Sequence, residues 1–213
     1  MWFVNTDPLK NTQAVSMAIV YNFIFIYFLQ YAAKLQAWDI RLLKQINLNR
    51  LPALDGFFLF LTNSAAFFAY GVPLGLLIFS MLKNNSSLKR GAIFVLLSVI
   101  VSNTISEIFK YTFNRPRPFL RYSFIQQLTP AYSPSFPSGH TVIAVGMAVA
   151  LGLIYRPGKY MVIVYSWALA VGYSRMDLGV HYPSDIIASI LTALIVCLVL
   201  YVFYRKLIVK PGQ

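Results

Sequence analysis

Charged residues are scarce in this chain. Only 11% of its 213 residues are charged, whereas 58% are hydrophobic, and the mean hydropathy is +0.65. A soluble domain of this length would carry about a quarter charged residues. The composition therefore excludes an ordinary soluble domain and predicts an integral membrane protein.

Acidic residues and cysteine are scarcer still. Six Asp and Glu stand against 18 Lys and Arg, which gives a formal net charge of +12. On a soluble domain this excess would suggest nucleic acid, but here the basic residues are scattered over loops between apolar runs and suit anionic lipid headgroups better. We expect the lipid bilayer as a partner, no nucleic acid and no obligate protein partner. The single cysteine, Cys197, excludes a disulfide within the chain and a cysteine-based metal site.

Apolar runs long enough to cross a bilayer recur along the whole chain. A membrane-spanning helix needs about 20 largely apolar residues. The runs predict an all-α fold, a polytopic membrane helical bundle of about six transmembrane helices, formed as a single domain over residues 1–213. The first run has no cleavage site after it and is interpreted as a retained helix. The predicted spans are Ala14–Ala33, Phe57–Leu82, Gly91–Phe109, Ser138–Tyr155, Lys159–Ser174 and Ser184–Tyr204.

Two connections between these spans have distinctive patterns. Leu35–Leu54 mixes Trp38 and Arg41 with apolar residues at helical spacing. This pattern is typical of a helix lying in the membrane interface, and an ordinary solvated connection fits it equally well. The long loop Lys110–Pro137 holds five of the eleven prolines. Long loops in compact proteins are usually functional or disordered, and the motifs at both ends of this one favour a functional loop.

Three short polar islands stand at the ends of apolar runs. Charges near a membrane core are costly and are normally kept for function. The islands contain both histidines of the chain, together with a Lys, three Arg and an Asp that follows the second His by four residues. A cationic cluster with two histidines is what phosphate-ester chemistry requires. The islands are residues 110–118, 137–140 and 174–185.

Six spans place both termini on one side of the membrane and all three islands on the other. Three basic residues, Lys110, Arg117 and Arg175, are assigned to the site and are left out of the comparison. Of the others, nine fall on the side of the termini and six on the opposite side. Because basic loops stay in the cytoplasm, we expect cytoplasmic termini and islands on the extracytoplasmic face.

The last island supplies a candidate nucleophile. Asp185 follows His181 by four residues, and Pro183 between them suits the first turn of a helix. A carboxylate in that turn can accept a hydrogen bond from one ring nitrogen of the histidine and leave the other nitrogen free to attack phosphorus. Taken alone, the pair fits a capping Asp beside an unrelated interfacial His almost as well.

The middle island supplies a candidate acid at the start of a helix. A helix start offers unpaired N–H groups to an anion, and Gly139 allows a close backbone approach. Ser138 adds a hydroxyl and is also a plausible N-cap. His140 can protonate the leaving oxygen and later activate water. A simple capped helix start would explain Ser138 and Gly139, but not a histidine at a membrane boundary.

The cationic residues form the third part of the predicted site. Lys110, Arg117 and Arg175 are predicted to hold the phosphate oxygens, because Arg offers a bidentate fork and Lys a point charge. Any one of them alone could be an interfacial residue that extends toward the headgroups. Glu107, three residues before Lys110, is expected to orient or neutralise that lysine. Nearby, Arg115 and Arg121 are weaker candidates for contacts that support the site residues or bind the headgroup, and Asp177 has no derivable role.

The three islands together resemble the motifs of the type 2 phosphatidic acid phosphatase superfamily. They read Lys-x6-Arg-Pro, Pro-Ser-Gly-His and Ser-Arg-x5-His-x3-Asp, in that order, within about 75 residues. One departure is that the family often has Gly shortly after the final Asp, where this chain has Ala188 and Ser189, and we interpret it as a matter of helix packing.

The resemblance implies an integral membrane lipid phosphatase that works without a metal or other cofactor through a phosphohistidine. In the matching positions, His181 would be the nucleophile, Asp185 its orienting partner and His140 the general acid. The residues implied to bind the substrate phosphate are Lys110, Arg117, Ser138, Gly139 and Arg175.

The motifs do not separate the substrates of the family. Undecaprenyl diphosphate is weakly favoured, since it suits an extracytoplasmic site; phosphatidylglycerophosphate, phosphatidic acid and lipid A remain alternatives. A compact chain without extra domains resembles bacterial members, which predicts the bacterial cytoplasmic (inner) membrane as its location.

A soluble vanadium haloperoxidase is disfavoured by the apolar spans. A carrier or flippase that binds lipid phosphates without hydrolysis would use the same cationic residues, but it would need neither nucleophile nor acid. A catalytically silent scaffold would be expected to lack a key side chain, and none is missing.

Overall fold

The computed structural model describes residues 8–155 and 158–208, and every regular element in these ranges is helical. The chain divides into two compact units, Met1–Arg41 and Leu42–Gln213. All three polar islands belong to the second unit. The predicted all-α fold is confirmed, while the assignment of residues 1–213 to a single domain stays a prediction.

Six long helices follow one another along the chain, close to the six predicted spans. Two short turns, η1 (Pro52–Leu54) and α4 (Pro118–Arg121), lie between them. The long helices are α1 (Pro8–Leu48), α2 (Asp55–Leu82), α3 (Ser86–Phe113), α5 (Gly139–Tyr155), α6 (Tyr160–Asp177) and α7 (Pro183–Ile208).

The connection after the first span is mostly helical and continues that span. The backbone stays helical from Pro8 to Leu48, and a position in the membrane interface stays a prediction. The sequence from 34 to 51 contains neither glycine nor proline, so nothing interrupts the helix before Pro52. Proline disfavours helical backbone in the residue before it, and Leu51 is accordingly extended.

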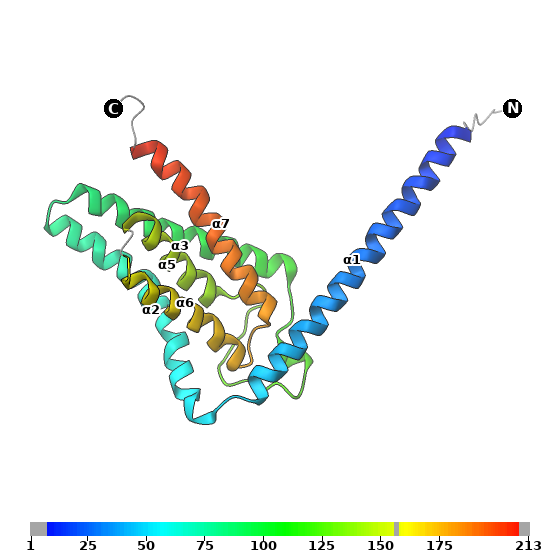
Figure 1. Ribbon diagram of the computed structural model, residues 1–213, viewed down its shortest axis with the longest axis horizontal. Helices are drawn as coiled ribbons and strands as arrows, with labels where there is room; N and C mark the ends of the chain where they lie inside the picture. Colours follow the sequence, from blue (N-terminus) through cyan, green and yellow to red (C-terminus); the bar gives the residue numbers. More distant parts are fainter. Residues whose placement is uncertain (1–7, 156–157, 209–213) are drawn as a thin grey trace. The chain divides into compact units, whose positions relative to one another are not determined.

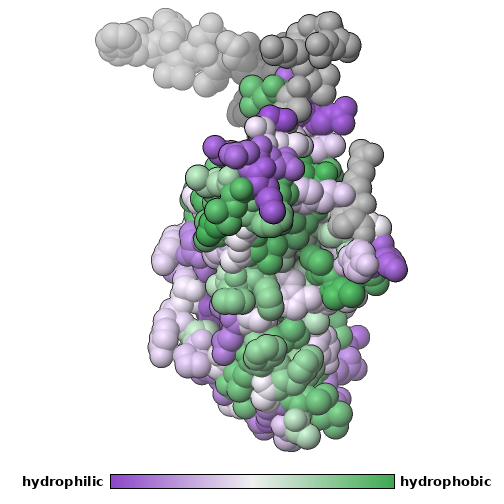
Figure 2. Space-filling view, turned by 90° about the vertical axis from the view of Figure 1, so that its left-hand side faces the viewer, coloured by the Kyte–Doolittle hydropathy of each residue, from purple (hydrophilic) through white to green (hydrophobic). Residues whose placement is uncertain are grey.

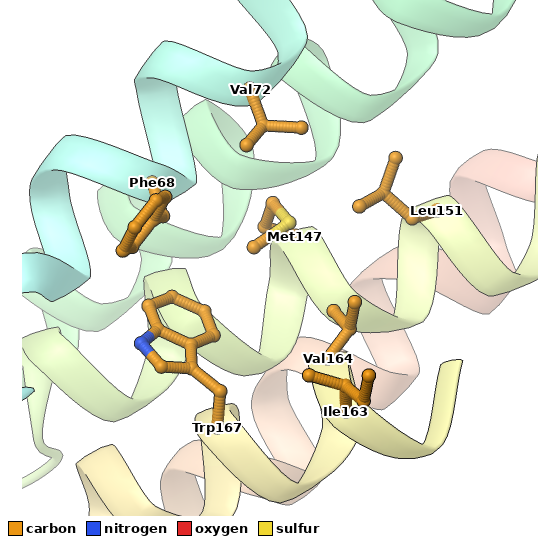
Figure 3. Close-up of a pocket in the computed structure, with 7 residues that line it drawn as sticks. All are labelled: Phe68, Val72, Met147, Leu151, Ile163, Val164 and Trp167. Atoms are coloured by element: carbon orange, nitrogen blue, oxygen red, sulfur yellow. The ribbon is translucent and has the colours of Figure 1, made fainter. Parts of the chain in front are cut away.

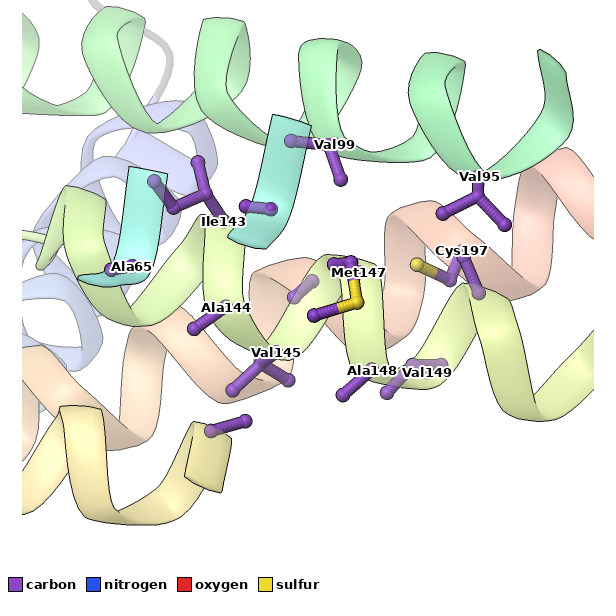
Figure 4. Close-up of a cluster of buried hydrophobic side chains, with 14 of the residues drawn as sticks. Ala65, Val95, Val99, Ile143, Ala144, Val145, Met147, Ala148, Val149 and Cys197 are labelled. Atoms are coloured by element: carbon purple, nitrogen blue, oxygen red, sulfur yellow. The ribbon is translucent and has the colours of Figure 1, made fainter. Parts of the chain in front are cut away.

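Helix α5 is the centre of the second unit. It packs against α2, α3, α6 and α7 (Figure 1). Ten consecutive residues, Thr141–Ala150, are buried, which is expected of a helix that is apolar on all sides and enclosed by others. Figure 4 shows part of the surrounding core, in which side chains of α2, α3 and α7, such as Ala65, Val99 and Cys197, meet those of α5.

The outer surface of the helices is apolar. Large hydrophobic side chains such as Phe60, Phe67 and Leu82 are about 70% exposed or more, and Figure 2 shows apolar residues spread over one face of the molecule. Within the described residues, three helical stretches are long and apolar enough to cross a membrane, and α5 is a shorter apolar helix. The stretches are Pro52–Leu82, Ser86–Arg121 and Pro183–Leu207. This surface suits lipid and not water.

The long loop between α3 and α5 is fastened to the helix ends. Asn47, at the end of α1, accepts a hydrogen bond from the Gln126 amide at 2.8 Å and donates to the carbonyls of Gln126 and Asp177 at 3.0 and 2.8 Å. Gly179 has a φ of +74°, and a Cβ there would overlap the Gln126 carbonyl oxygen. The loop therefore packs directly against the end of α6, next to the third polar island.

Candidate active site

The polar islands meet at one end of the bundle. Helices α3 and α6 end there, α5 and α7 begin there, and the loops before α5 and α7 complete the cluster. His140 lies close enough to Lys110, Arg117, Arg175 and His181 to be influenced by their charges. Antiparallel packing of these helices thus brings together residues that are up to 71 positions apart in the sequence.

His181 lies in the short connection between α6 and α7 and is 2% exposed. Its Nδ1 lies 3.4 Å from Asp185 Oδ2, and its Nε2 lies 3.2 Å from Arg117 Nη1. A guanidinium can only donate hydrogen bonds, so Nε2 must be the acceptor and carry no proton. The remaining ring proton belongs on Nδ1, facing Asp185. These two contacts favour the tautomer with its proton on Nδ1, and the lone pair of Nε2 accepts a hydrogen bond from Arg117.

Burial also keeps this imidazole neutral. Loss of solvent lowers the pKa of His181 to about 4, and the hydrogen bond with Asp185 offsets part of that effect. Nearby Arg117 and Arg175 lower it further. At neutral pH the ring is therefore uncharged and can act as a nucleophile.

Asp185 is fully buried in the first turn of α7 and has more partners than the sequence indicated. Arg115 Nη1 donates to its Oδ1 at 2.5 Å, and Ser135 Oγ and the Tyr182 amide donate to its Oδ2 at 2.5 and 3.0 Å. Arg115 also donates to Ser184 Oγ at 2.8 Å and lies 3.9 Å above the Tyr182 ring. The carboxylate is held on both oxygens, so its position beside His181 does not depend on the histidine alone.

Sequence reasoning missed Ser135 and named Arg115 only as a weak candidate for supporting the site. Arg115 was given only a weak role, and Ser135 none, although the Ser135 amide also donates to the Arg115 carbonyl at 2.8 Å. They lie 70 and 50 residues from Asp185. Arg115 stands two positions before Arg117 in the first island, which was the only signal available; Ser135 carried none.

The cationic residues surround the same space. Arg117 donates to the Ser133 and Val180 carbonyls at 2.7 and 3.0 Å, which ties the long loop to the segment before His181. Lys110 forms the expected ion pair with Glu107, with 2.6 Å between Nζ and Oε1. These contacts fix the charged groups before any substrate arrives.

Arg175 is held from α2. Its Nη1 donates to Thr62 Oγ1 at 2.6 Å, and the side chain is 3% exposed. Its Nε has no hydrogen-bond partner among the described residues. A buried guanidinium with an unsatisfied donor is costly unless an anion is bound nearby. This arrangement fits a phosphate-binding role.

The start of α5 supplies backbone donors. The first N–H groups of a helix have no partner within it, and the positive end of the helix dipole favours an anion there. Gly139 is the first residue of α5, and a Cβ at that position would lie 3.2 Å from Lys110 Nζ. Ser138 precedes it and accepts a hydrogen bond from Thr141 Oγ1 at 2.9 Å. The glycine therefore leaves room for the lysine ammonium beside the helix start.

Figure 3 shows a separate pocket away from this cluster. It has a volume of about 290 Å³ and is lined by apolar and aromatic side chains of α2, α5 and α6, among them Phe68, Met147 and Trp167. Between this pocket and the polar cluster, α2 and α6 contact each other. Arg175 bonds to Thr62 there, and the Phe58 ring packs against the Tyr173 ring. Without polar side chains the pocket cannot perform phosphate chemistry, so we assign the candidate site to the polar cluster.

A model of the PAP2 superfamily matches residues 91–208, which is more than half of the chain and includes every candidate site residue. The chain belongs to the PAP2 superfamily. It is a membrane lipid phosphatase of that family, and the resemblance inferred from the three motifs is confirmed.

Named relatives and solved structures agree with this assignment. The chain is 29% identical over 153 residues to an undecaprenyl-diphosphatase of Sulfolobus acidocaldarius, covering 71% of both chains. It is 33% identical to a lipid A 4'-phosphatase of Porphyromonas gingivalis, covering 72% of this chain and 67% of the relative. A crystal structure of a transmembrane PAP2-type phosphatidylglycerolphosphate phosphatase from Bacillus subtilis superposes with a TM-score of 0.66 at 26% identity, covering 89% of this chain and 96% of that one.

The site draws its positive charge from side chains. Lys110, Arg117 and Arg175 gather around His140. Among the residues that the structure describes, there is no group of three or more His, Cys, Asp or Glu side chains suited to hold a metal ion.

Proposed function

We propose that this PAP2 phosphatase hydrolyses the phosphomonoester or diphosphate headgroup of a membrane lipid through a phosphohistidine at His181. The observation that carries the proposal is the neutral imidazole, with Nε2 facing Arg117 and Nδ1 facing Asp185. A nucleophile with a fixed tautomer and a cationic neighbour is what attack on a phosphorylated headgroup requires.

In the first step, His181 Nε2 attacks phosphorus and the bond from phosphorus to the leaving oxygen breaks. His140, which takes up a proton when the anionic headgroup offsets the cationic side chains around it, gives that proton to the leaving oxygen. Asp185 stabilises the positive charge that develops on the His181 ring. Arg117, which contacts Nε2 in the substrate-free site, shifts its hydrogen bond to a phosphate oxygen. Lys110, Arg175 and the first N–H groups of α5 hold the remaining charge.

In the second step, His140, now neutral, takes a proton from water. The resulting hydroxide attacks phosphorus, and the P–N bond to His181 breaks. Inorganic phosphate leaves when the lipid is a monoester and also when a diphosphate loses its terminal phosphoryl group. No step uses a metal ion.

We propose undecaprenyl diphosphate as the first substrate to test. Its support is the undecaprenyl-diphosphatase among the relatives together with the expected extracytoplasmic site. A lipid A phosphatase and a phosphatidylglycerolphosphate phosphatase are also among the relatives and solved structures, so lipid A and phosphatidylglycerophosphate belong in the same test, with phosphatidic acid.

The test is phosphate release by detergent-purified protein from this lipid panel, with EDTA present. We expect release that survives EDTA and disappears in His181→Ala, and a phosphorylated protein that can be trapped in the wild type by a rapid alkaline quench, because the P–N bond of a phosphohistidine breaks in acid. The rank order of kcat/KM identifies the substrate. Release that requires an added metal, or that persists in His181→Ala, would contradict the mechanism. Binding of lipid without any release would favour the non-hydrolytic carrier.

A further inference from the structure

Ser189 lies on α7 one turn after Asp185 and is completely buried. Residues four apart on a helix share a face, so its side chain points in the same direction as that of Asp185. That face packs against α5. None of the three polar islands includes this serine.

The Ser189 hydroxyl makes contacts on both sides of the seam between α5 and α7. It accepts a hydrogen bond from the Ser138 backbone N–H at 2.8 Å and donates to the Asp185 carbonyl at 2.6 Å. The Ser138 carbonyl lies 3.1 Å away as a second acceptor. Bonding of a serine hydroxyl to the carbonyl four residues earlier is common within helices. The contact with the Ser138 amide is different, because it joins residues 51 positions apart.

The Ser138 amide would otherwise be a buried donor without a partner. It stands at the start of a helix, where backbone N–H groups find no acceptor within the helix. By accepting this hydrogen bond, Ser189 withdraws the Ser138 N–H from substrate and leaves the following N–H groups of α5 to bind phosphate. The same hydrogen bond sets the separation between the start of α5, near His140, and the start of α7, beside His181.

We infer that Ser189 is a positioning residue, whose hydroxyl holds the start of α5 against α7 so that His140 and His181 face the same phosphoryl group. The inference rests on the proposed function, because it concerns the distance between the proposed acid and nucleophile. A displacement of about 1 Å between such groups is enough to cost a large factor in rate. The Ala188–Ser189 pair, which the sequence suggested affects only helix packing, thereby acts on the chemistry.

The chain contains a matched control for this inference. Cys197 lies eight residues after Ser189 on α7, and its Sγ contacts the Gly146 carbonyl, eight residues after Ser138, at 3.4 Å. Both side chains are completely buried and both join α7 to the backbone of α5. The Cys197 contact lies two helical turns deeper, away from the polar cluster. Ser189→Ala and Cys197→Ala therefore each remove the polar group that joins α7 to the backbone of α5 at one level of the seam, but only Ser189 lies beside the site.

The experiment compares the purified full-length wild type, Ser189→Ala and Cys197→Ala, with the lipid that the wild type hydrolyses best. We expect kcat about tenfold lower in Ser189→Ala, with a similar loss of inhibition by vanadate, which mimics the phosphoryl group in transfer. Hydrogen exchange of the Ser138 amide should accelerate. In Cys197→Ala, kcat, vanadate inhibition and Ser138 exchange should match the wild type, even if the thermal midpoint of this variant is lower.

Three outcomes would overturn the inference. They are a Ser189→Ala kcat within twofold of the wild type, an equal loss of kcat in both variants, or a loss of kcat without faster Ser138 exchange. Failure of the proposed function would look different, because phosphate release would then be absent from the wild type or would persist in His181→Ala.

Discussion

At the scale of single residues, the contacts of Asp185 determine how the carboxylate beside the proposed nucleophile is held. The carboxylate accepts hydrogen bonds from Arg115, Ser135 and the Tyr182 amide, all within 3.0 Å, whereas its contact with His181 Nδ1 is 3.4 Å. In substrate-free sites, catalytic hydrogen bonds are often longer than in the reacting complex. The three shorter bonds hold the carboxylate in place until substrate draws the histidine closer.

Asp185→Asn should lower kcat strongly with little change in KM. The amide keeps the shape of the side chain but loses the charge that stabilises the imidazolium and pairs with Arg115. In serine hydrolases the equivalent change costs about 10⁴-fold, so we expect a loss of about 10²- to 10⁴-fold here. Steady-state kinetics of phosphate release provide the measurement. Asp177→Asn, at another buried aspartate, serves as the control, and unchanged turnover in Asp185→Asn would rule out the orienting role.

The protonation of His181 can be followed directly, because the chain has only two histidines. The pKa of His181 is lowered to about 4 by burial, so the ring should stay neutral as the pH falls through 6.5 and gain a proton only near pH 4. NMR of histidine-labelled His140→Asn protein in detergent micelles would contain this single imidazole. A titration at or above pH 6.5 would contradict the neutral nucleophile. Unfolded protein in denaturant provides the reference value.

At the scale of helices, the candidate site is built from the ends of four helices. The ends of α3 and α6 provide Lys110 and Arg175, and the beginnings of α5 and α7 provide His140 and Asp185. Helix ends have unpaired backbone groups and lie where the apolar run stops, so polar side chains can gather there at lower cost than within a span. The same logic made the polar islands visible in the sequence.

Gly139→Ala should lower activity without lowering stability. Alanine is the better helix former, but its Cβ would lie 3.2 Å from Lys110 Nζ and push the ammonium away from the start of α5. We expect kcat/KM to fall about tenfold, while the thermal midpoint stays the same or rises. Gly146→Ala in the same helix is the control, because its Cβ would meet Ser102 Oγ at an ordinary 3.4 Å. Equal kcat/KM in both variants would exclude the close approach as the reason for the glycine.

At the scale of the whole molecule, the arrangement of the helices places the whole candidate site at one end of the bundle. All three islands gather at one end of the second unit, as six spans require. The excess of basic residues in the loops at the other end predicts an extracytoplasmic site. The family and the apolar helices establish an integral membrane protein and leave this orientation as a prediction.

A cysteine reporter can test the orientation. Tyr132 is 96% exposed in the loop that reaches the site, and Asn84 is exposed in the turn between α2 and α3 at the other end. The native cysteine, Cys197, is buried and should not react. In intact cells, a membrane-impermeant maleimide should label Tyr132→Cys but not Asn84→Cys, while both react after lysis. Labelling of Asn84→Cys alone would place the site on the cytoplasmic face.

The hydrophobic pattern predicted the helices well but not every boundary. The predicted span Ser138–Tyr155 agrees with α5 within two residues at each end, and so does the span Phe57–Leu82 with α2. The segment after the first span was interpreted as separate because its charged residues interrupt the apolar run. Helical hydrogen bonding depends on the backbone and tolerates charged side chains, so α1 continues to Leu48.

The sequence by itself determined the class of the protein, its helices and the eight residues gathered at one end, because apolar periodicity and the three motifs are local properties of the chain. Only the tertiary structure decided which donors hold Asp185, that Thr62 supports Arg175, and that Ser189 joins α7 to the start of α5. Apart from the Tyr182 amide, these partners lie between 50 and 113 residues apart. Hydrogen bonds act over about 3 Å and depend on direction, so they are settled by how the helices pack and leave no regular spacing in the sequence.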